Sequence, residues 1–294
     1  MGGDILCIGS VMWDVIGRAT CDMRQGSDVG GTITRVPGGV ALNIAMTCAR
    51  FGLRPVLLSA VGADRPGDEL LAQCEDLGLV TAHVHRAPDG ATDRYMAVEG
   101  ANGVIAAIAD ARTLETAGDA ILAPLRTGAL ATAEAPFGGL AALDGNLTDA
   151  LLHEIAHGPL FARADLRIAP ASPGKAARLR PFLKAGRGVL YVNCEEAGIL
   201  CGQSFDSSHA AAAAVIERGA RRVVVTHGPD AATDATQDAM ITATPPKITV
   251  SRLTGAGDTF MAAHIAAEAG GADRKAALSQ ALGAAGAYVS GEDP

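Results

Sequence analysis

The stretch KITVSRLTGAGDTFMAAHIAA, residues 247–267, places a short strand, a glycine-rich turn and an apolar helix in immediate succession. The first turn of a helix leaves backbone N–H groups without partners, and glycines let an anion approach those groups closely. Gly255, Ala256 and Gly257 therefore predict an anion hole at the start of the helix. A hole of this kind accepts a phosphate group.

Asp258 stands at the start of the same helix, and two interpretations of it stay open. A carboxylate at this position can cap the free amides of the first turn. Beside a bound phosphate group, it can also orient and deprotonate an attacking hydroxyl group during in-line phosphoryl transfer. A dinucleotide-binding fingerprint is disfavoured because Phe260 replaces its third small residue. The sequence contains no Walker loop.

The composition is that of a globular protein, with 49% of the 294 residues apolar and 19% charged. We expect one large α/β domain over residues 1–294. The net charge of −8 disfavours a nucleic-acid polymer as partner. Six scattered cysteines without a C-x-x-C pair are typical of free thiols in a reducing cytosol. The sequence shows neither a secretory signal nor a membrane span, so we expect a cytoplasmic protein.

Short apolar runs alternate with longer segments of helical period, a pattern typical of a parallel sheet covered by helices on both faces. The predicted strands span residues 5–8, 56–60, 139–143, 166–169, 189–192 and 222–226. The predicted helices span residues 40–51, 67–77, 149–157, 174–183, 208–218, 258–269 and 274–289. This pattern predicts a Rossmann-like, doubly wound α/β fold with a mainly parallel sheet. Residues 230–238 are polar and rich in turn formers, which indicates a surface excursion.

Two stretches interrupt the alternation, residues 11–36 and residues 92–110. The first is rich in Gly and Thr, and the second is typical of a hairpin around Asn102-Gly103, because Asn-Gly accepts the positive φ angles of a tight turn. Together they predict a small β-sheet that serves as a lid over one edge of the domain. Exposed edges of such a lid often pair across a dimer, so we also expect a homodimer.

The motif LTGAGDTF, residues 253–260, and the motif VPGGVALNIA, residues 36–45, together resemble the two signatures of the ribokinase-like (PfkB) carbohydrate and nucleoside kinases. The resemblance spans nearly the whole chain. It implies a Rossmann-like domain with a β-sheet lid, and transfer of the ATP γ-phosphoryl group to a primary hydroxyl group. It also implies that Asp258 is the catalytic base, and that the amides of Gly255, Ala256 and Gly257 stabilise the moving phosphoryl group.

Residues expected on the acceptor side follow the first strand and open the second motif. Asp14 stands near the carboxyl end of a strand, where open α/β sheets bind ligands, and an ordinary surface aspartate is the alternative. Gly38 and Gly39 let a ligand approach the backbone, and Asn43 offers both a donor and an acceptor to vicinal hydroxyl groups. The resemblance implies that these residues hold a sugar.

Residues expected on the nucleotide side lie further along the chain. The segment Asn193-Cys-Glu-Glu196 resembles the family's Asn-x-x-Glu motif, which implies that Asn193 and Glu196 hold Mg²⁺ mainly through its waters. A helix cap is the alternative for the same residues. The resemblance further assigns Thr226, Gly228 and Thr254 to the binding of ATP.

Two positions depart from the family pattern. Ala231 stands where a second glycine is usual, which leaves the adenine contacts unassigned. Arg252 stands where many relatives carry an aspartate that helps to bind a monovalent cation. A guanidinium group cannot ligate K⁺, but it can supply positive charge itself. We therefore expect turnover that does not depend on K⁺.

Several short segments resemble pseudouridine kinases more than ribokinases, namely residues 9–15, 92–95, 107–110, 144–147 and 170–176. They favour a C-nucleoside that is phosphorylated on its 5′-hydroxyl group. Thr92 and Tyr95 are candidates for contact with the base, and cross-strand packing is the alternative for this pair. Two other functions stay open: a ribokinase- or fructokinase-like sugar kinase, and a non-catalytic nucleoside-binding protein on the same fold.

Overall fold

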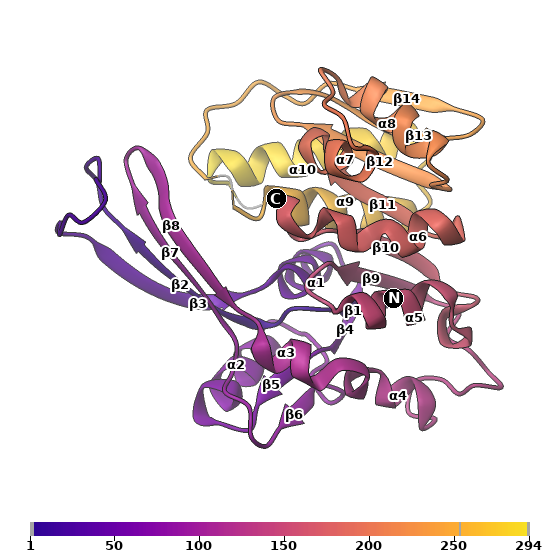
Figure 1. Ribbon diagram of the computed structural model, residues 1–294, viewed down its shortest axis with the longest axis horizontal. Helices are drawn as coiled ribbons and strands as arrows, with labels where there is room; N and C mark the ends of the chain where they lie inside the picture. Colours follow the sequence, from indigo (N-terminus) through magenta and orange to yellow (C-terminus); the bar gives the residue numbers. More distant parts are fainter. Residues whose placement is uncertain (1–2, 253, 293–294) are drawn as a thin grey trace.

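The computed structural model describes residues 3–252 and 254–292, so Leu253 of the glycine-rich motif lies outside the described residues. Eight strands form the central sheet in the order β14-β13-β12-β11-β10-β9-β1-β4, and the six from β12 to β4 run parallel (Figure 1). The strands are β1 (Asp4–Ile8), β4 (Arg54–Leu58), β9 (Leu140–Asp144), β10 (Asp165–Ala169), β11 (Val189–Asn193), β12 (Arg222–His227), β13 (Asp230–Thr236) and β14 (Met240–Ala243). The predicted mainly parallel α/β fold is confirmed.

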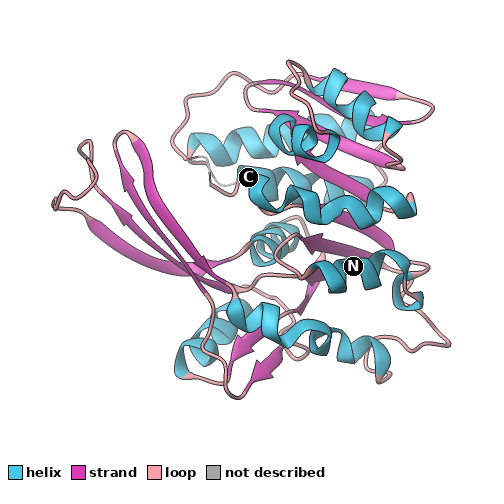
Figure 2. Ribbon diagram, in the orientation of Figure 1, coloured by secondary structure: helices cyan, strands magenta, loops and turns pink. Residues whose placement is uncertain are grey.

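Helices cover both faces of this sheet, as Figure 2 shows. They are α1 (Val40–Arg50), α2 (Arg65–Asp76), α3 (Arg112–Ala117), α4 (Ala123–Arg126), α5 (Asp149–His157), α6 (Arg180–Ala185), α7 (Cys194–Cys201), α8 (Ser208–Glu217), α9 (Ala256–Ala269) and α10 (Arg274–Ser290). Successive residues of β1 alternate between two cores: Leu6 and Ile8 belong to the core that includes residues of α5, α7 and α8, whereas Ile5 and Cys7 belong to the core that includes residues of α1, α9 and α10. A strand that is buried on both faces needs apolar residues at every position.

A second sheet projects from the edge of the domain, at the left of Figure 1. Its strands, in spatial order, are β3 (Thr32–Gly38), β2 (Met12–Arg18), β7 (Arg94–Gly100) and β8 (Gly103–Asp110). Residues 11–36 and 92–110 therefore form a small sheet together, as the sequence predicts. A two-stranded parallel sheet of β5 (Ala60–Gly62) and β6 (His85–Ala87) lies near its base. No helix within the described ranges is long and apolar enough to cross a membrane.

Two predictions along the chain are wrong. Residues 230–236 form β13 instead of a surface excursion, because Thr233 and Asp234 are fully buried with polar partners. The Thr233 hydroxyl group bonds that of Ser208 at 2.9 Å, and Asp234 is ion-paired. Residues 247–251, before the glycine-rich turn, form no strand. There the backbone amide of Ser251 instead donates to the carbonyl oxygen of Val289, at 2.9 Å.

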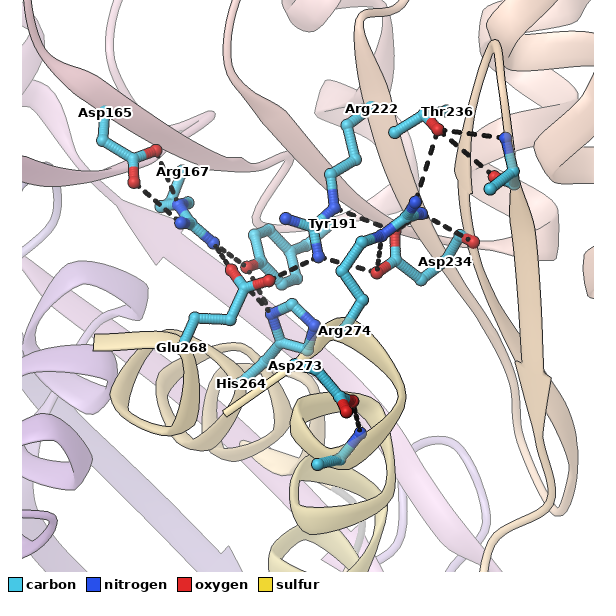
Figure 3. A network of polar contacts seen from close by, with 12 residues as sticks. Asp165, Arg167, Tyr191, Arg222, Asp234, Thr236, His264, Glu268, Asp273 and Arg274 are labelled. Carbon is cyan, nitrogen blue, oxygen red and sulfur yellow. Dashed lines mark hydrogen bonds and ion pairs between the residues drawn. The ribbon is translucent and has the colours of Figure 1, made fainter. Parts of the chain in front are cut away.

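A network of buried charges fastens α9 to the sheet (Figure 3). Glu268 of α9 lies between Arg167 of β10 and Arg222 of β12, and it accepts from the Arg222 Nη2 atom at 2.6 Å. His264, one turn earlier, bonds the Tyr191 hydroxyl group at 2.9 Å through Nδ1. Because these partners of α9 are strand residues, the position of its first turn is set by the sheet. That first turn carries Asp258.

Candidate active site

The first turn of α9 has free backbone amides. Gly255 precedes the helix with φ +89°, and no side chain caps the helix among the residues described. A Cβ atom at Gly255 would lie 2.6 Å from the Tyr288 hydroxyl oxygen, so only glycine fits. The first helical bond is donated by Thr259 to the Gly255 carbonyl oxygen, at 2.9 Å. The amides of Ala256, Gly257 and Asp258 are therefore available to an anion.

Asp258 does not cap this helix. Its carboxylate accepts a hydrogen bond from the Asn43 side-chain amide, at 2.9 Å between Nδ2 and Oδ2. Burial raises the pKa of Asp258 to about 7, although the Asn43 bond lowers it, and the nearby Asp144 and Asp14 carboxylates raise it further. A carboxylate with a pKa near the working pH is suited to take and release a proton. The base interpretation is the one that fits this geometry.

Asp14 lies on β2, where it pairs with Tyr95 of β7 and Val36 of β3. Burial raises the pKa of Asp14 to about 6. A Cβ atom at Gly38 would lie 2.2 Å from the Asp14 carboxyl carbon, so a side chain at position 38 would displace this carboxylate. Gly39 has φ +96°, and a Cβ atom there would meet the Ser10 carbonyl oxygen at 2.6 Å. Gly38 thus leaves room for the Asp14 carboxylate, and Gly39 is required by its own backbone angle and by the Ser10 backbone.

The amides that open α1 are occupied, unlike those of α9. The Ser10 hydroxyl oxygen accepts from the Val40 amide at 2.9 Å, and the Asp144 carboxylate accepts from the Ala41 amide at 3.0 Å. Asp144 is fully buried at the end of β9, and it also accepts from the Ser10 hydroxyl group at 2.7 Å. The helix that carries Asn43 is therefore held against the ends of β1 and β9.

A cavity of about 500 Å³ joins these groups at the carboxyl edge of the central sheet. Its polar and glycine lining comes from both motifs and from the ends of several strands: Ser10, Asp14, Gly39, Asn43, Tyr95, Asn146, Ser172, Lys175, Tyr191, Asn193, Glu196, Thr226, Thr254, Gly255, Gly257 and Asp258. Most of the residues predicted for acceptor and nucleotide thus share one cavity, because the carboxyl ends of parallel strands meet at one edge.

Two residues predicted on the acceptor side, Gly38 and Thr92, do not line this cavity, and Thr92 has other partners. Its side chain is buried and bonds the Asp64 carboxylate, and its backbone amide donates to the other Asp64 oxygen at 3.0 Å. Asp64 in turn caps α2 by accepting from the Gly67 amide at 2.9 Å. Thr92 therefore fixes the base of the small sheet to α2 and does not line the cavity. The prediction that it contacts a base is wrong, whereas Tyr95 does line the cavity.

Asn193 and Glu196 form a reciprocal cap at the start of α7. The Glu196 amide donates to Asn193 Oδ1, and the Asn193 amide donates to Glu196 Oε2, both at 2.8 Å. Burial raises the pKa of Glu196. The side chains still line the cavity, so the cap and a role toward a ligand are compatible. No cluster of three or more His, Cys, Asp or Glu side chains suited to a metal occurs in the described part of the chain.

A second hollow of about 810 Å³ adjoins the first through Asn193 and Thr226. Its lining includes Gly228, which has φ +55°, together with His227 and Phe205. The predicted nucleotide residues are therefore divided, with Gly228 in the outer hollow and Thr254 in the inner cavity. The two hollows form a continuous lining from the start of α9 to the end of β12.

The comparison with protein families decides the identity. The model of the family described as "pfkB family carbohydrate kinase" matches residues 3–293 of this chain. The chain belongs to the pfkB family. This pfkB-family chain is 34% identical over 94 residues to the pseudouridine kinase of Escherichia coli strain K12, a match that covers 32% of this chain and 30% of that protein. The match thus spans about a third of the length of that curated relative.

Solved structures share the fold of this pfkB-family chain. A carbohydrate kinase from Agrobacterium tumefaciens superimposes with a TM-score of 0.79 at 24% identity, over 98% of this chain and 90% of that one. The ribokinase of Arabidopsis thaliana, solved with ribose and ATP, superimposes with a TM-score of 0.77 at 20% identity, over 98% of this chain and 93% of that one. At these identities the likeness establishes the α/β fold with its small sheet.

Arg252 of this pfkB-family chain does not reach the anion hole. Its Nε atom donates to the Tyr288 carbonyl oxygen at 2.7 Å, and its guanidinium group stacks over the Tyr288 ring at 3.9 Å. The Tyr288 hydroxyl group donates to the Thr254 carbonyl oxygen at 2.8 Å. Arg252 therefore closes the carboxyl end of α10 and supports the glycine-rich turn from outside, so the predicted supply of charge to the anion hole is wrong. Turnover independent of K⁺ stays a prediction.

Sequence reasoning assigned no individual role to four residues that the fold brings to the cavity or its wall, namely Ser10, Asp144, Asn146 and Lys175. Each follows or ends a strand of the parallel sheet. That position was the signal that could have found them, because ligands of open α/β sheets bind at the carboxyl ends of strands.

Proposed function

We propose that the chain transfers the γ-phosphoryl group of ATP to a primary hydroxyl group of a nucleoside or sugar. The observation that carries this proposal is the uncapped, glycine-opened start of α9, with Asp258 beside it and Asn43 in contact with Asp258. The Asp258 carboxylate takes the hydroxyl proton. The acceptor oxygen forms a bond to the γ-phosphorus atom, the bond from that atom to the bridging oxygen breaks, and ADP leaves.

The acceptor and the nucleotide enter this arrangement from opposite sides. Asp14, Asn43 and the Gly38–Gly39 backbone hold the acceptor below the small sheet, with Tyr95 beside it. The amides of Gly255, Ala256 and Gly257 receive the transferred group, and Thr226, Thr254 and Gly228 lie along the path of the nucleotide. The amides act by electrostatic stabilisation of the charge that spreads over the phosphoryl oxygens.

The acidic cavity also fits a divalent cation. Asp14, Glu196 and Asp258 all line it, and an ATP molecule brings further negative charge. Asn193 and Glu196 offer the oxygen groups that Mg²⁺ prefers, with room for its waters. When bound there, Mg²⁺ would neutralise charge on the nucleotide phosphates. Residues 1–294 then work as one domain, and residues 11–36 and 92–110 serve as the lid that excludes water.

The acceptor that we propose is pseudouridine, phosphorylated on its 5′-hydroxyl group. Support comes from the curated relative with the name pseudouridine kinase and from the position of Tyr95 over the acceptor side. A ribokinase- or fructokinase-like sugar kinase is the second candidate, favoured by the ribokinase fold likeness. A nucleoside-binding protein without catalysis is the third, and an intact Asp258 with its Asn43 partner argues against it.

The small sheet is also the surface that we propose for a homodimer. The strand register places the exposed apolar side chains of Ile33, Met96 and Ile108 on one face of it, whereas Val36 pairs with Asp14 on the other face. Met96 and Ile108 are cross-strand partners, on the face opposite to Asp14 and Tyr95. A second copy would cover this face without blocking the cavity. Five of the six cysteines are buried and Cys21 is exposed, which suits the proposed cytoplasmic location.

A coupled assay for ADP release tests the proposed function with pseudouridine, uridine, ribose and fructose side by side. We expect turnover that is fastest with pseudouridine. The variant Asp258→Asn should keep its fold and its ligand binding and lose about two to four decades of turnover, the effect typical of a lost general base. Asp76→Asn, an exposed aspartate on α2, is the control and should retain full activity. Acceptor-dependent thermal shifts without ADP release would reject a kinase in favour of a binding protein.

A further inference from the structure

The loop that follows β10 enters the cavity in a strained conformation. Ala171 has φ +71°, the one non-glycine residue with positive φ within the described ranges. A backbone in this region is unfavourable for alanine, so surrounding contacts must hold it there. A Cβ atom at Gly145 would lie 2.2 Å from the Pro170 carbonyl oxygen, which shows that the loops after β9 and β10 touch. Strain of this kind clusters at functional sites.

This loop leads to Lys175, whose side chain is half-buried and lines the cavity. The Lys175 ammonium group donates to the Asn146 side-chain oxygen. The Asn146 side-chain amide in turn donates to the Ser10 hydroxyl oxygen at 2.9 Å. Arg178 steadies the same region, because its Nη1 atom donates to the Gly145 carbonyl oxygen at 3.2 Å. An ammonium group has three donors, so a bond to Asn146 leaves others for a ligand.

The order of the strands places Lys175 between the two ligands of the proposed reaction. Asp14 follows β1, whereas Asn193 ends β11 and Thr226 lies near the end of β12. The strands β9 and β10 lie between β1 and β11 in the sheet. A group carried at the end of β10 therefore stands between the acceptor side and the nucleotide side. The phosphoryl group must cross this part of the cavity.

The charged side chains that line the cavity set Lys175 apart. Within the described lining, Lys175 is the sole cationic side chain, and the carboxylates of that lining are those of Asp14, Glu196 and Asp258. These carboxylates repel an anionic phosphoryl group. Burial lowers the pKa of Lys175, because its ammonium group is less well hydrated than that of a surface lysine. An ammonium group in this state has a stronger electrostatic attraction to an anionic partner than a fully hydrated ammonium group has.

We propose that Lys175 binds the γ-phosphoryl group of the nucleotide as that group passes to the acceptor. This inference rests on the proposed function. In the free protein Asn146 holds the ammonium group in place, and the phosphoryl oxygens take over its remaining donors when the nucleotide binds. Lys175 then adds charge on the side of the phosphoryl group opposite to the amides of α9.

Equilibrium binding tests this assignment without any need for turnover. The dissociation constants of ADP and of the non-hydrolysable ATP analogue adenylyl imidodiphosphate are measured by calorimetry for wild type, Lys175→Met, Lys175→Arg and Lys184→Met. Lys184 is an exposed lysine on α6 and serves as the matched control. We expect Lys175→Met to weaken the binding of the analogue at least tenfold and the binding of ADP less than threefold. Lys175→Arg should keep most of the preference for the analogue, and Lys184→Met should keep all of it.

Turnover gives the second reading. Removal of one group that stabilises the transition state typically lowers kcat by about two to three decades, so Lys175→Met should lose about a hundredfold in kcat with little change in the KM of the acceptor. A raised acceptor KM at unchanged kcat would overturn the assignment and make Lys175 an acceptor contact. An equal weakening of ADP binding and analogue binding would overturn the assignment as well. So would a fall in melting temperature, in both Lys175→Met and Lys175→Gln, that is large enough to explain the loss of kcat by unfolding.

The two proposals fail in different ways. Wild-type protein that phosphorylates none of the four acceptors contradicts the proposed function. The ratio of the two dissociation constants still decides on Lys175 in that case, because it reports contact with the third phosphate group and not the transfer step.

Discussion

The surroundings of Asp258 raise the pKa of its carboxyl group to about 7, so the group keeps its proton up to nearly neutral pH. Burial is the main cause, and the carboxylates of Asp144, Asp14 and Glu196 act in the same direction. An isolated aspartate titrates at about pH 3.9. The acid form is therefore favoured in the folded protein over a wide range in which the unfolded chain has already lost the proton.

This difference predicts a pH dependence of the rate. With the pKa of Asp258 at about 7, kcat/KM for the acceptor should rise about tenfold per pH unit below that value and level off above it. The residual rate of Asp258→Asn should show no such rise, and Asp76→Asn should follow wild type. A wild-type profile that is flat between about pH 5 and pH 8 would show that this carboxylate is not the base.

The same group has the opposite effect on stability. Its folded pKa is raised, so the unfolded chain binds fewer protons between about pH 4 and pH 7, and stability falls as pH rises through that window. Asp258→Asn should therefore melt higher than wild type at about pH 8, and this gain should shrink toward about pH 4. Melting curves at the two pH values measure it.

Most single residues of the site follow from local pattern. Glycines at 255 and 257 before an apolar helix indicate an anion hole by themselves. The structure adds that Gly255 has φ +89° and lies close to the Tyr288 hydroxyl group, so only glycine fits there. Thr92 could not be assigned in this way. Its hydroxyl group bonds Asp64, which lies 28 positions earlier in the chain, and no spacing in the sequence predicts that pair.

At the level of elements, β13 shows why polar composition misleads. Its residues Thr233 and Asp234 are polar, yet both are fully buried. Asp234 accepts from Arg222 of the neighbouring strand and from Arg274 of α10, at 2.6 and 2.7 Å. Charged residues are buried when they are paired, and the partners here lie 12 and 40 positions away. Periodicity within a short window carries no information about such partners.

Asp234→Ala should destabilise the fold strongly. It leaves Arg222 and Arg274 without their shared carboxylate, and loss of one partner from a buried ion pair typically costs about 3–5 kcal/mol. Denaturant unfolding measures the change, and Asp238→Ala on the exposed turn beside β13 is the control, expected within about 0.5 kcal/mol of wild type. The pKa of Asp234 is lowered by these arginines, so its contribution should be present above about pH 4 and be lost as the pH falls further. Equal stability of the two variants would contradict the role of the network.

Across the whole molecule, the small sheet is unusual in leaving apolar side chains in solvent. Ile33 is 77% exposed and Ile108 is 64% exposed. An apolar sheet face with two open edges tends to pair with another chain. Because the sheet also carries Asp14 and Tyr95 on its opposite face, association of two copies would steady the small sheet of each copy.

The double variant Ile33→Glu, Ile108→Glu should therefore be monomeric where wild type is dimeric. Light scattering coupled to size exclusion measures the mass, and Leu77→Glu, which changes an exposed apolar residue on the main domain, should stay dimeric. Wild type that elutes as a monomer at micromolar concentration would remove the basis for the proposed interface.

The alternation of strands and helices over most of the chain and the glycine-opened start of α9 follow from the sequence alone, because each depends on neighbours within a few positions. The contacts of Lys175, Asp144 and Thr92 and the burial of β13 were decided only by tertiary structure. Their partners are distant in the chain and meet at one sheet edge or in one buried pair. A carboxylate or an ammonium group has no fixed task until folding sets which charges surround it and how much water it keeps.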